Sequence, residues 1–293
     1  MSLANSPIKL NDGTTIPWLG FGTGTALYAK DAEKMVTAAI QSGLTHLDGA
    51  QIYGNEDSLG AGIIASGRPR SELFVTTKLK KLPEGVSVRD SVVESLQKLK
   101  TNYIDLLLIH VPTNFPGRLK ETWKELEALK AEGLTRSIGV SNFGISTLKE
   151  IMEGSTIVPA VNQVEFHAHV YEEFRPLLEF AKEHNIVIES FGGLSPLFRV
   201  KNSPVVPVVE KIAKSKAKVA GKPVTTSQIL LLWLKQKGIV AITTSTKVER
   251  VEEYLAVDGV PELTAEEIAE IDAAGAKEHH RHFTSFYNYN PAE

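Results

Sequence analysis

A regular alternation of short apolar segments with longer amphipathic stretches constrains the fold of this chain more than any other feature. In the longer stretches apolar residues recur at helical spacing, for example in Asp31–Ser42, Val88–Leu99, Leu119–Glu132 and Phe174–His184. Glycine follows several of them, as at Gly43 and Gly133, which is typical of a left-handed helix cap. The apolar segments of strand length are Leu19–Gly22, Thr45–Asp48, Leu73–Thr77, Ile104–His110, Ser137–Val140, Ala160–Val164, Val187–Ser190 and Ile239–Ile242.

Eight such units predict an α/β protein whose parallel strands are joined by right-handed crossovers. Because no second module is visible, we expect closure into a (β/α)8 barrel, the TIM-barrel fold. Residues 1–293 are therefore predicted to form a single barrel domain, a size that such barrels commonly reach. A doubly wound open sheet is the rival fold, but the glycine-rich run at 20–24 lacks the spacing of a dinucleotide-binding loop.

The two ends of the chain differ from this pattern. Residues Ile8 to Ile16 alternate apolar and polar side chains around an Asn-Asp-Gly turn, which predicts an N-terminal β-hairpin. Residues 277–293 are rich in histidine and aromatic side chains and show no helical period. In a barrel enzyme this segment would be a loop, and we expect it to border the substrate pocket.

Composition excludes several classes of function. The net charge of −3 at pH 7, with both signs interspersed, gives no reason to expect a nucleic-acid or anionic-membrane partner. The chain has no cysteine, which excludes disulfides, thiolate metal sites and cysteine nucleophiles. The start, MSLANSPIKL, lacks the regions of a secretory signal, and the apolar runs are too short to span a bilayer. We expect a cytoplasmic protein.

Titratable side chains follow three successive predicted strands. Asp48 ends the second strand, Lys78 follows the third and His110 ends the fourth. In a parallel barrel these ends lie side by side at the carboxyl-terminal face, where barrel active sites are found. Tyr53 follows Asp48 in the loop that leaves the second strand, so it can turn back over the same opening. Each residue alone has an ordinary structural explanation, but the four together favour a catalytic site.

These four residues form a plausible device for delivering a proton. A tyrosine, with a pKa of about 10, is a poor acid near neutrality, and a nearby ammonium group is expected to lower that pKa. Asp48 would hold Lys78 in place, and His110 would orient a carbonyl oxygen. This chemistry suits addition of a hydride to a carbonyl carbon, with Tyr53 giving a proton to the oxygen.

Several ordered motifs resemble those of the aldo-keto reductase family over essentially the whole chain. They are Asp48-Gly-Ala-Gln-Ile-Tyr53-Gly-Asn-Glu56, Lys78 after Phe-Val-Thr-Thr, His110 after Asp-Leu-Leu-Leu-Ile, Ile138-Gly-Val-Ser-Asn-Phe143 and Val161-Asn-Gln-Val-Glu165. The resemblance implies that Tyr53 is the general acid, that His110 positions the substrate carbonyl, and that Asp48 and Lys78 tune the tyrosine.

The resemblance also implies a nicotinamide cofactor. Ser141, Asn142 and Gln163 would hydrogen-bond the carboxamide, and Phe191 matches the aromatic residue on which the nicotinamide ring stacks. Ser195 and Leu197 are candidate phosphate contacts in a segment whose glycines replace the usual Ser-Pro. The full predicted cofactor set is Gly22, Thr23, Ser141, Asn142, Gln163, Phe191, Gly192, Leu194, Ser195, Leu197, Thr244, Ser245, Thr246, Lys247, Arg250, Glu253 and Tyr254.

The segment after the eighth strand bears on the choice between NADPH and NADH. Family members that favour NADPH carry a Lys-Ser pair and an arginine there. In this chain Thr244 occupies the lysine position, while Ser245 and Arg250 remain, and Lys247 can supply the missing cation. An arginine fork with a nearby lysine favours a 2′-phosphate, so NADPH is the expected cofactor and NADH the weaker one. Tyr254 is expected beside the adenine.

Two further departures concern the substrate. Gly24 and Val111 stand where the family often has aromatic residues, which predicts a more open pocket mouth. Phe283 and Tyr287 of the tail are the other predicted pocket residues. These features resemble the fungal branch that includes conjugated polyketone (ketopantoyl lactone) reductases and arabinose-dehydrogenase-like enzymes. They imply activity on activated ketones such as α-diketones and α-keto lactones.

Other functions remain open at this point. One is an NAD(P)-linked sugar or alcohol dehydrogenase that runs in the oxidative direction. Another is a non-catalytic family member, a redox sensor or structural protein, against which the intact set of four residues argues. A metal-dependent barrel hydrolase is the weakest, because histidines and carboxylates do not fall in ligand-like pairs at the strand ends. We therefore expect no metal, a small carbonyl compound as substrate, and a monomer, with a dimer as the alternative.

Overall fold

A computed structural model describes residues 6–284 of the chain. Within this range eight parallel strands form a closed barrel in the order β10-β3-β4-β5-β6-β7-β8-β9, which confirms the predicted (β/α)8 fold. Each strand overlaps a predicted apolar segment. The strands are β3 (Leu19–Gly22), β4 (His46–Asp48), β5 (Phe74–Leu79), β6 (Ile104–Ile109), β7 (Thr135–Ser141), β8 (Val161–Glu165), β9 (Val187–Phe191) and β10 (Val240–Thr243).

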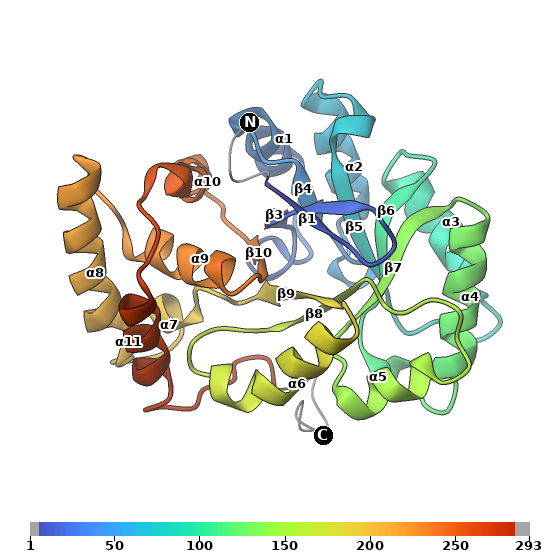
Figure 1. Cartoon of the computed structure of the whole chain (residues 1–293). Coiled ribbons are helices and arrows are strands. Elements are labelled where there is room, and N and C mark those ends of the chain that lie inside the picture. The colour runs from blue at the N-terminus through green and yellow to red at the C-terminus, as the bar shows by residue number, and fades with distance from the viewer. Residues whose placement is uncertain (1–5, 285–293) are drawn as a thin grey trace.

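Helices surround the barrel and connect its strands (Figure 1). Gly43 and Gly133 have φ angles of +116° and +79°, so both end a helix in the left-handed region as predicted. The helices are α1 (Glu33–Ser42), α2 (Glu56–Ala65), α3 (Val88–Lys98), α4 (Leu119–Ala131), α5 (Ile145–Met152), α6 (Tyr171–Glu183), α7 (Ser195–Phe198), α8 (Val205–Ala220), α9 (Thr226–Gln236), α10 (Val248–Leu255) and α11 (Ala265–Gly275).

The predicted hairpin is present as β1 (Pro7–Lys9) and β2 (Thr15–Pro17), which pair antiparallel. It closes the amino-terminal end of the barrel. Leu10 and Ile16, both buried, form one apolar cluster with side chains from the lower barrel interior, namely Phe74, Leu106, Leu108, Ala160, Val161 and Val240. Removing this apolar surface from water anchors the hairpin and excludes solvent from that end.

Successive side chains of a barrel strand point alternately outward, to the helices, and inward, to the barrel interior. On β5, Val75 and Leu79 belong to the large apolar core beneath the helices. The alternate residues Thr76 and Lys78 form hydrogen bonds to side chains of β4, across the barrel interior. Polar groups therefore occupy the upper interior, toward the carboxyl ends of the strands, and apolar groups fill the lower interior.

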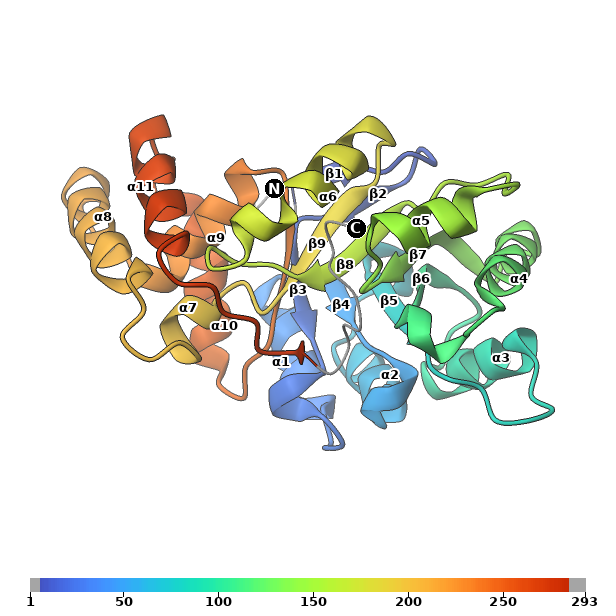
Figure 2. The ribbon, with the colours of Figure 1, turned by 90° about the horizontal axis from the view of Figure 1, so that it is seen from below.

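The segment after α11 runs across the molecule toward the barrel strands (Figure 2). Glu165, at the end of β8, accepts hydrogen bonds from the backbone N–H groups of His282 (2.8 Å) and Phe283 (3.1 Å). These bonds bring the described part of the tail to the carboxyl-terminal face.

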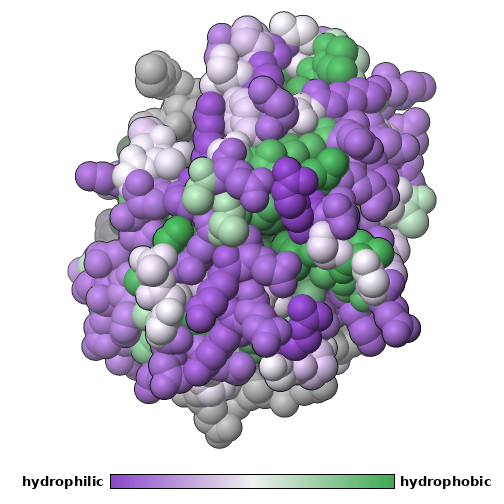
Figure 3. All heavy atoms as spheres, turned by 90° about the vertical axis from the view of Figure 1, so that its right-hand side faces the viewer, coloured by the Kyte–Doolittle hydropathy of each residue, from purple (hydrophilic) through white to green (hydrophobic). Residues whose placement is uncertain are grey.

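The outer surface over α3, α4 and α5 is mainly hydrophilic (Figure 3). In the described range no helix is long and apolar enough to cross a membrane.

Candidate active site

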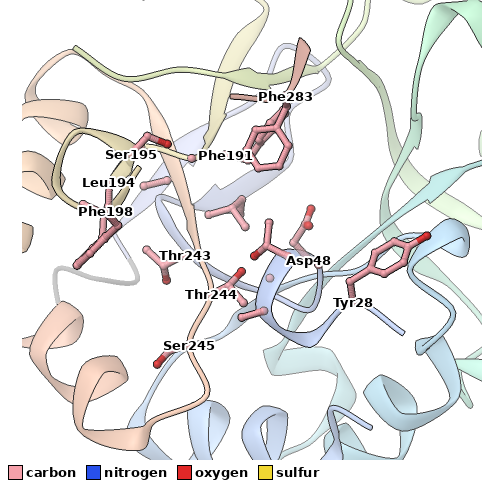
Figure 4. A pocket seen from close by; sticks show the side chains of 18 of the residues that line it. Tyr28, Asp48, Phe191, Leu194, Ser195, Phe198, Thr243, Thr244, Ser245 and Phe283 are labelled. Atoms are coloured by element: carbon pink, nitrogen blue, oxygen red, sulfur yellow. The ribbon is translucent and has the colours of Figure 1, made fainter. Parts of the chain in front are cut away.

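A cavity of about 1050 Å³ opens at the carboxyl ends of the strands. Figure 4 shows its walls, with Phe191 and Phe283 together on one side and Thr243, Thr244 and Ser245 along another. The predicted residues that line it are Gly22, Gly24, Asp48, Tyr53, His110, Asn142, Gln163, Phe191, Gly192, Leu194, Ser195, Thr244, Ser245, Thr246, Lys247, Arg250, Tyr254 and Phe283.

Three other predicted residues lie just behind the cavity wall. Lys78 is fully buried beneath Tyr53. The Thr23 hydroxyl donates to the backbone oxygen of Asp48 (3.3 Å), and the Ser141 hydroxyl donates to the backbone oxygen of Gln163 (2.8 Å). All three support residues that form the surface of the cavity.

Three further predicted residues lie in the described range but not at the cavity surface. Val111 is buried at the start of a 3-10 turn, and Leu197 packs partly buried against the apolar core. The Glu253 carboxylate accepts a hydrogen bond from Thr225 (2.7 Å) at the start of α9 and is engaged there. Tyr287 lies outside the described residues.

Lys78 is the centre of the buried polar cluster. Its ammonium group donates to both carboxylate oxygens of Asp48 (2.6 and 2.8 Å) and to the Gly49 carbonyl (2.8 Å). The fourth contact is with the hydroxyl of Tyr53, at 3.4 Å. A buried charge needs this degree of compensation, and the aligned strand ends provide it. The four predicted catalytic residues thus meet at one point.

Burial sets the protonation state of Tyr53. Withdrawal from water raises the pKa of its hydroxyl above the ordinary value, although Lys78 pulls it down. The sequence predicted a lowered pKa, and this was wrong because desolvation of the phenolate outweighs the attraction of one ammonium group. Burial alone would lower the pKa of Lys78, but Asp48, Tyr53 and Glu189 together raise it. Both groups hold their protons at neutral pH.

The ring of His110 meets that of Tyr53 edge-on, with 5.6 Å between centroids and 83° between planes. Burial, and then the charge of Lys78, lower the pKa of His110 to about 3. The imidazole is therefore neutral at physiological pH and carries one N–H group. A neutral donor and a protonated phenol beside the same space can both point at one oxygen atom.

Gly24 allows the Tyr53 ring to lie against the backbone. A Cβ atom at position 24 would lie 2.9 Å from Cζ of Tyr53 and 3.3 Å from its hydroxyl oxygen. The Tyr53 ring therefore lies directly against this glycine, which itself lines the cavity, and whether Gly24 widens the pocket mouth stays a prediction. Tyr28, which the sequence did not predict, lies edge-on to Tyr53 (6.1 Å between centroids) and also lines the cavity.

Two buried polar atoms of the cavity wall lack partners within residues 6–284. Asn142, held at a φ of +64°, donates through Nδ2 to the His110 carbonyl (2.9 Å), while its Oδ1 is unpaired. The hydroxyl of Ser195 is also unpaired. An amide oxygen ready to accept and a hydroxyl ready to donate fit a carboxamide and a phosphate respectively. The site therefore has the donor and acceptor set that a nicotinamide dinucleotide requires.

The aromatic wall is closely packed. The ring of Phe283 meets Phe191 edge-on at 5.2 Å, and the Arg199 guanidinium lies 5.2 Å from the centre of Phe283. Gly192 has a φ of +71°, and a Cβ at Gly193 would lie 2.6 Å from a methyl carbon of Leu234. Close packing and a left-handed turn therefore explain these two glycines, and they present Phe191 to the cavity.

Two of the cationic side chains that line the cavity, Lys247 and Arg250, lie at its opposite end. Lys247 lies at the start of α10, where its backbone N–H donates to Ser245 (2.9 Å). The guanidinium of Arg250 lies 4.9 Å from the ring centre of Phe198, a cation–π contact. Tyr254 is buried beside them. Positive charge, a helix start and a hydroxyl together suit an anionic ligand.

Sequence reasoning missed several residues of the site. Tyr28, Phe198 and Arg199 line the cavity from the ends of a 3-10 turn and of the four-residue helix α7, elements too short for a local sequence pattern to specify. Glu189 was placed in a strand but not in the site. An acidic residue inside an apolar strand was the available signal, because a buried carboxyl group needs polar partners. No group of three or more histidine, aspartate or glutamate residues within the described chain is arranged to hold a metal ion.

The barrel and its buried Asp-Tyr-Lys-His cluster define an oxidoreductase site of the NAD(P)H-dependent kind, and comparison with known proteins identifies the family. Residues 18–276 match the Aldo/keto reductase family, to which this chain belongs. It is 38% identical to a Schizosaccharomyces pombe NAD/NADP-dependent indole-3-acetaldehyde reductase, over 92% of this chain and 96% of the other. It is 35% identical to a Bacillus subtilis glyoxal reductase (92% and 93%).

Further relatives support the assignment to this family. A Saccharomyces cerevisiae NADPH-dependent alpha-keto amide reductase is 30% identical over 94% of this chain and 92% of its own. The solved structure of a Bombyx mori aldo-keto reductase in complex with NADP has a TM-score of 0.81 and 31% identity, covering 98% of both chains. The chain is thus an NAD(P)H-dependent oxidoreductase. The finer assignment to the fungal branch and the single-domain boundary at 1–293 stay predictions.

Proposed function

We propose that this protein uses NADPH to reduce activated ketones and aldehydes to alcohols, with Tyr53 as the proton donor. The observation that carries the proposal is the position of the Tyr53 hydroxyl. It lies on the cavity wall, 3.4 Å from the buried ammonium of Lys78 and edge-on to the neutral ring of His110. This is the arrangement expected of a general acid beside a carbonyl-binding group.

Each residue of the cluster has a distinct task. When bound, the nicotinamide supplies a hydride to the carbonyl carbon and its ring becomes a cation. Tyr53 gives its proton to the carbonyl oxygen, and Lys78 stabilises the phenolate that remains. His110 donates a hydrogen bond to the same oxygen and so fixes the orientation of the substrate. Asp48 holds the Lys78 ammonium in place.

Side chains of the cavity wall would make the contacts to the cofactor. Phe191 would stack on the nicotinamide ring, while Gln163 and Asn142 would bind its carboxamide. Ser195 would donate to a phosphate. Ser245, Lys247 and Arg250 would surround the 2′-phosphate of NADPH, which NADH lacks.

Two of the relatives support an electron-poor substrate. A glyoxal reductase and an alpha-keto amide reductase are named for compounds in which one carbonyl group adjoins another. Such carbonyl carbons accept hydride readily. We therefore expect α-diketones and α-keto lactones to be better substrates of this chain than straight-chain aldehydes or aldoses.

The first test follows the loss of nicotinamide absorbance with NADPH, and separately with NADH, against an α-diketone, a keto lactone, an aromatic aldehyde and an aldose. Faster oxidation of NADPH with the first two supports the whole proposal. Equal rates for all four compounds would contradict the substrate class alone. Faster oxidation of an aldose or alcohol, followed in a separate assay as the gain of nicotinamide absorbance with NADP+ or NAD+, would favour a dehydrogenase. Tight NADPH binding without any turnover would favour a sensor or structural role.

A further inference from the structure

A second buried carboxyl group lies deeper in the barrel than the catalytic cluster. Glu189 on β9 is fully buried, and its Oε2 atom accepts a hydrogen bond of 2.8 Å from Nε2 of Gln163. The same Nε2 atom donates to Oδ2 of Asp48, also at 2.8 Å. Both hydrogens of the Gln163 amide are thus committed to carboxyl groups. Its carbonyl oxygen is the end that remains for a ligand in the cavity.

The other oxygen of Glu189 has an unusual neighbour. Oε1 is buried, has no hydrogen-bond partner in the described chain, and lies 3.5 Å from Nε2 of His46. The Nδ1 atom of His46 is 3.1 Å from the Pro17 carbonyl, so it must carry the ring proton. Nε2 of the neutral ring is then a lone pair, which can accept a hydrogen bond from the Thr76 hydroxyl at 3.2 Å and also faces the carboxyl oxygen. A proton on Oε1 turns this repulsion into an attraction.

The charges around Glu189 favour that proton. Asp48 faces it from β4, Lys78 from β5 and the Tyr53 hydroxyl from the turn after β4, while the paired positions of β10 are apolar. Burial, and then the charge of Asp48, raise the pKa of Glu189 to about 8. Burial lowers the pKa of His46 to about 4. Below pH 8 the floor of the site therefore holds one ion pair, Asp48 with Lys78, and no net charge.

We propose that Glu189 is a positioning residue that acts in its protonated form, and that its ionisation shifts the preference of the site from reduced toward oxidised cofactor. This inference rests on the proposed function. In the protonated form the carboxyl group orients Gln163, whose oxygen then accepts a hydrogen bond from the nicotinamide carboxamide. Residue 189 precedes Phe191 by two positions on one strand, so both point into the barrel in successive layers. A negative charge there attracts the cationic oxidised ring and leaves the neutral reduced ring unaffected.

The test measures the dissociation constants of NADPH and NADP+ by titration calorimetry from about pH 6 to about pH 10, on either side of the pKa of Glu189. The ratio of the NADPH constant to the NADP+ constant cancels the titration of the shared 2′-phosphate. In the wild type we expect this ratio to rise about tenfold as the pH passes through 8. A factor of this size is expected when one carboxylate attracts one cationic ring in partly buried surroundings.

Glu189→Gln is the decisive variant because it imitates the protonated acid. Its carbonyl accepts from Gln163 and its amide donates to Nε2 of His46, so both affinities at low pH should be kept and the ratio should become independent of pH. Glu56→Gln is the matched control. Glu56 is also buried, with a raised pKa, but its carboxyl group binds Thr77 and Ser95 away from the cavity. This control should titrate as the wild type does.

A third variant separates orientation from charge. Glu189→Leu removes the acceptor of the Gln163 amide and should weaken both cofactors at every pH. A wild-type ratio that does not change with pH, or an unchanged titration in Glu189→Gln, would overturn the inference while leaving the proposed function intact. Failure of the wild type to bind either cofactor would overturn both.

Discussion

The two ends of the cavity are built in different ways. At the catalytic end the functional groups lie on or directly after barrel strands, and Asp48, Lys78 and Gln163 are almost completely buried and joined by hydrogen bonds of 2.6 to 2.8 Å. At the cationic end Lys247 is exposed and Arg250 half-buried, and the Phe198 side chain is 55% exposed. The strand register fixes the first set, whereas a loop and a helix start carry the second.

This difference predicts where a substitution has large effects. Strand pairing places Asp48 opposite Thr76, two residues before Lys78, so the barrel determines the distance between the catalytic groups. Each polar group there depends on its partners because an unpaired buried charge is expensive. At the cationic end solvent can replace a lost contact, and single contacts contribute less.

The largest effect is expected for Tyr53→Phe, which breaks the catalytic end and spares the other. The ring keeps its place beside Gly24, but no proton donor remains. Turnover should fall by about 10²- to 10⁴-fold or more, as for loss of a general acid, with NADPH affinity unchanged. Single-turnover kinetics together with NADPH titration checks this. Retained turnover would reject Tyr53 as the acid.

Gly24→Ala tests how tightly the catalytic end is packed. The new methyl group would lie 2.9 Å from the Tyr53 ring, so the ring must move. A displaced catalytic group lowers turnover by up to about 10²-fold. NADPH affinity should change little, because the cationic end is untouched. Wild-type turnover in this variant would show that the segment around residue 24 moves to make room for the methyl group, and that Tyr53 does not need a glycine there.

The sequence predicted that the side chains of the catalytic end lie together, because Asp48, Lys78 and His110 stand directly at the ends of apolar segments and the barrel topology brings such ends together. The sequence did not predict the properties that depend on how deeply a titratable side chain is buried. Neither the raised pKa of Tyr53 nor the partners of Glu189 follow from spacing, since both depend on desolvation by residues distant in the chain. Residues such as Phe198, which ends the four-residue helix α7, depend on a chain path that no local pattern fixes.

Arg250→Ala breaks the cationic end and spares the catalytic one. If Arg250 binds the 2′-phosphate, loss of its charged hydrogen bonds should weaken NADPH by roughly 10- to 100-fold, or about 1.5 to 3 kcal/mol. NADH affinity should change far less, and turnover at saturating NADPH should be kept. Equal losses for the two cofactors, measured by titration, would contradict the 2′-phosphate role.

The pH dependence of the free energy of unfolding tests the buried carboxyl group beneath the catalytic end. The pKa of folded Glu189 is about 8, above the ordinary 4.5. The stability that its proton contributes is therefore complete below pH 4.5 and is lost as the pH rises to about 8. Glu189→Gln does not titrate, so its stability relative to wild type should rise over this range by up to about 1.4 kcal/mol per pH unit.

Denaturant unfolding of the wild type and Glu189→Gln at several pH values measures this change. Glu249→Gln, at an exposed position of α10, serves as the control and should show a constant difference from wild type. A constant difference for Glu189→Gln as well would mean that Glu189 is ionised in the folded protein at neutral pH.

The smallest effect is expected for Phe198→Ala, which tests whether the cationic end has any preorganisation of its own. The Phe198 ring is the aromatic partner of the Arg250 guanidinium, which lies 4.9 Å from its centre, and the Tyr254 hydroxyl contacts the Arg250 side chain. An exposed cation–π contact contributes about 0.5 to 1 kcal/mol, so NADPH affinity should fall by about two- to fivefold. In Arg250→Ala the same substitution should have no further effect on the preference for NADPH over NADH, because the guanidinium that it orients is gone. A loss of preference in the double variant larger than in Arg250→Ala alone would show that Phe198 contacts the 2′-phosphate end directly and not through Arg250.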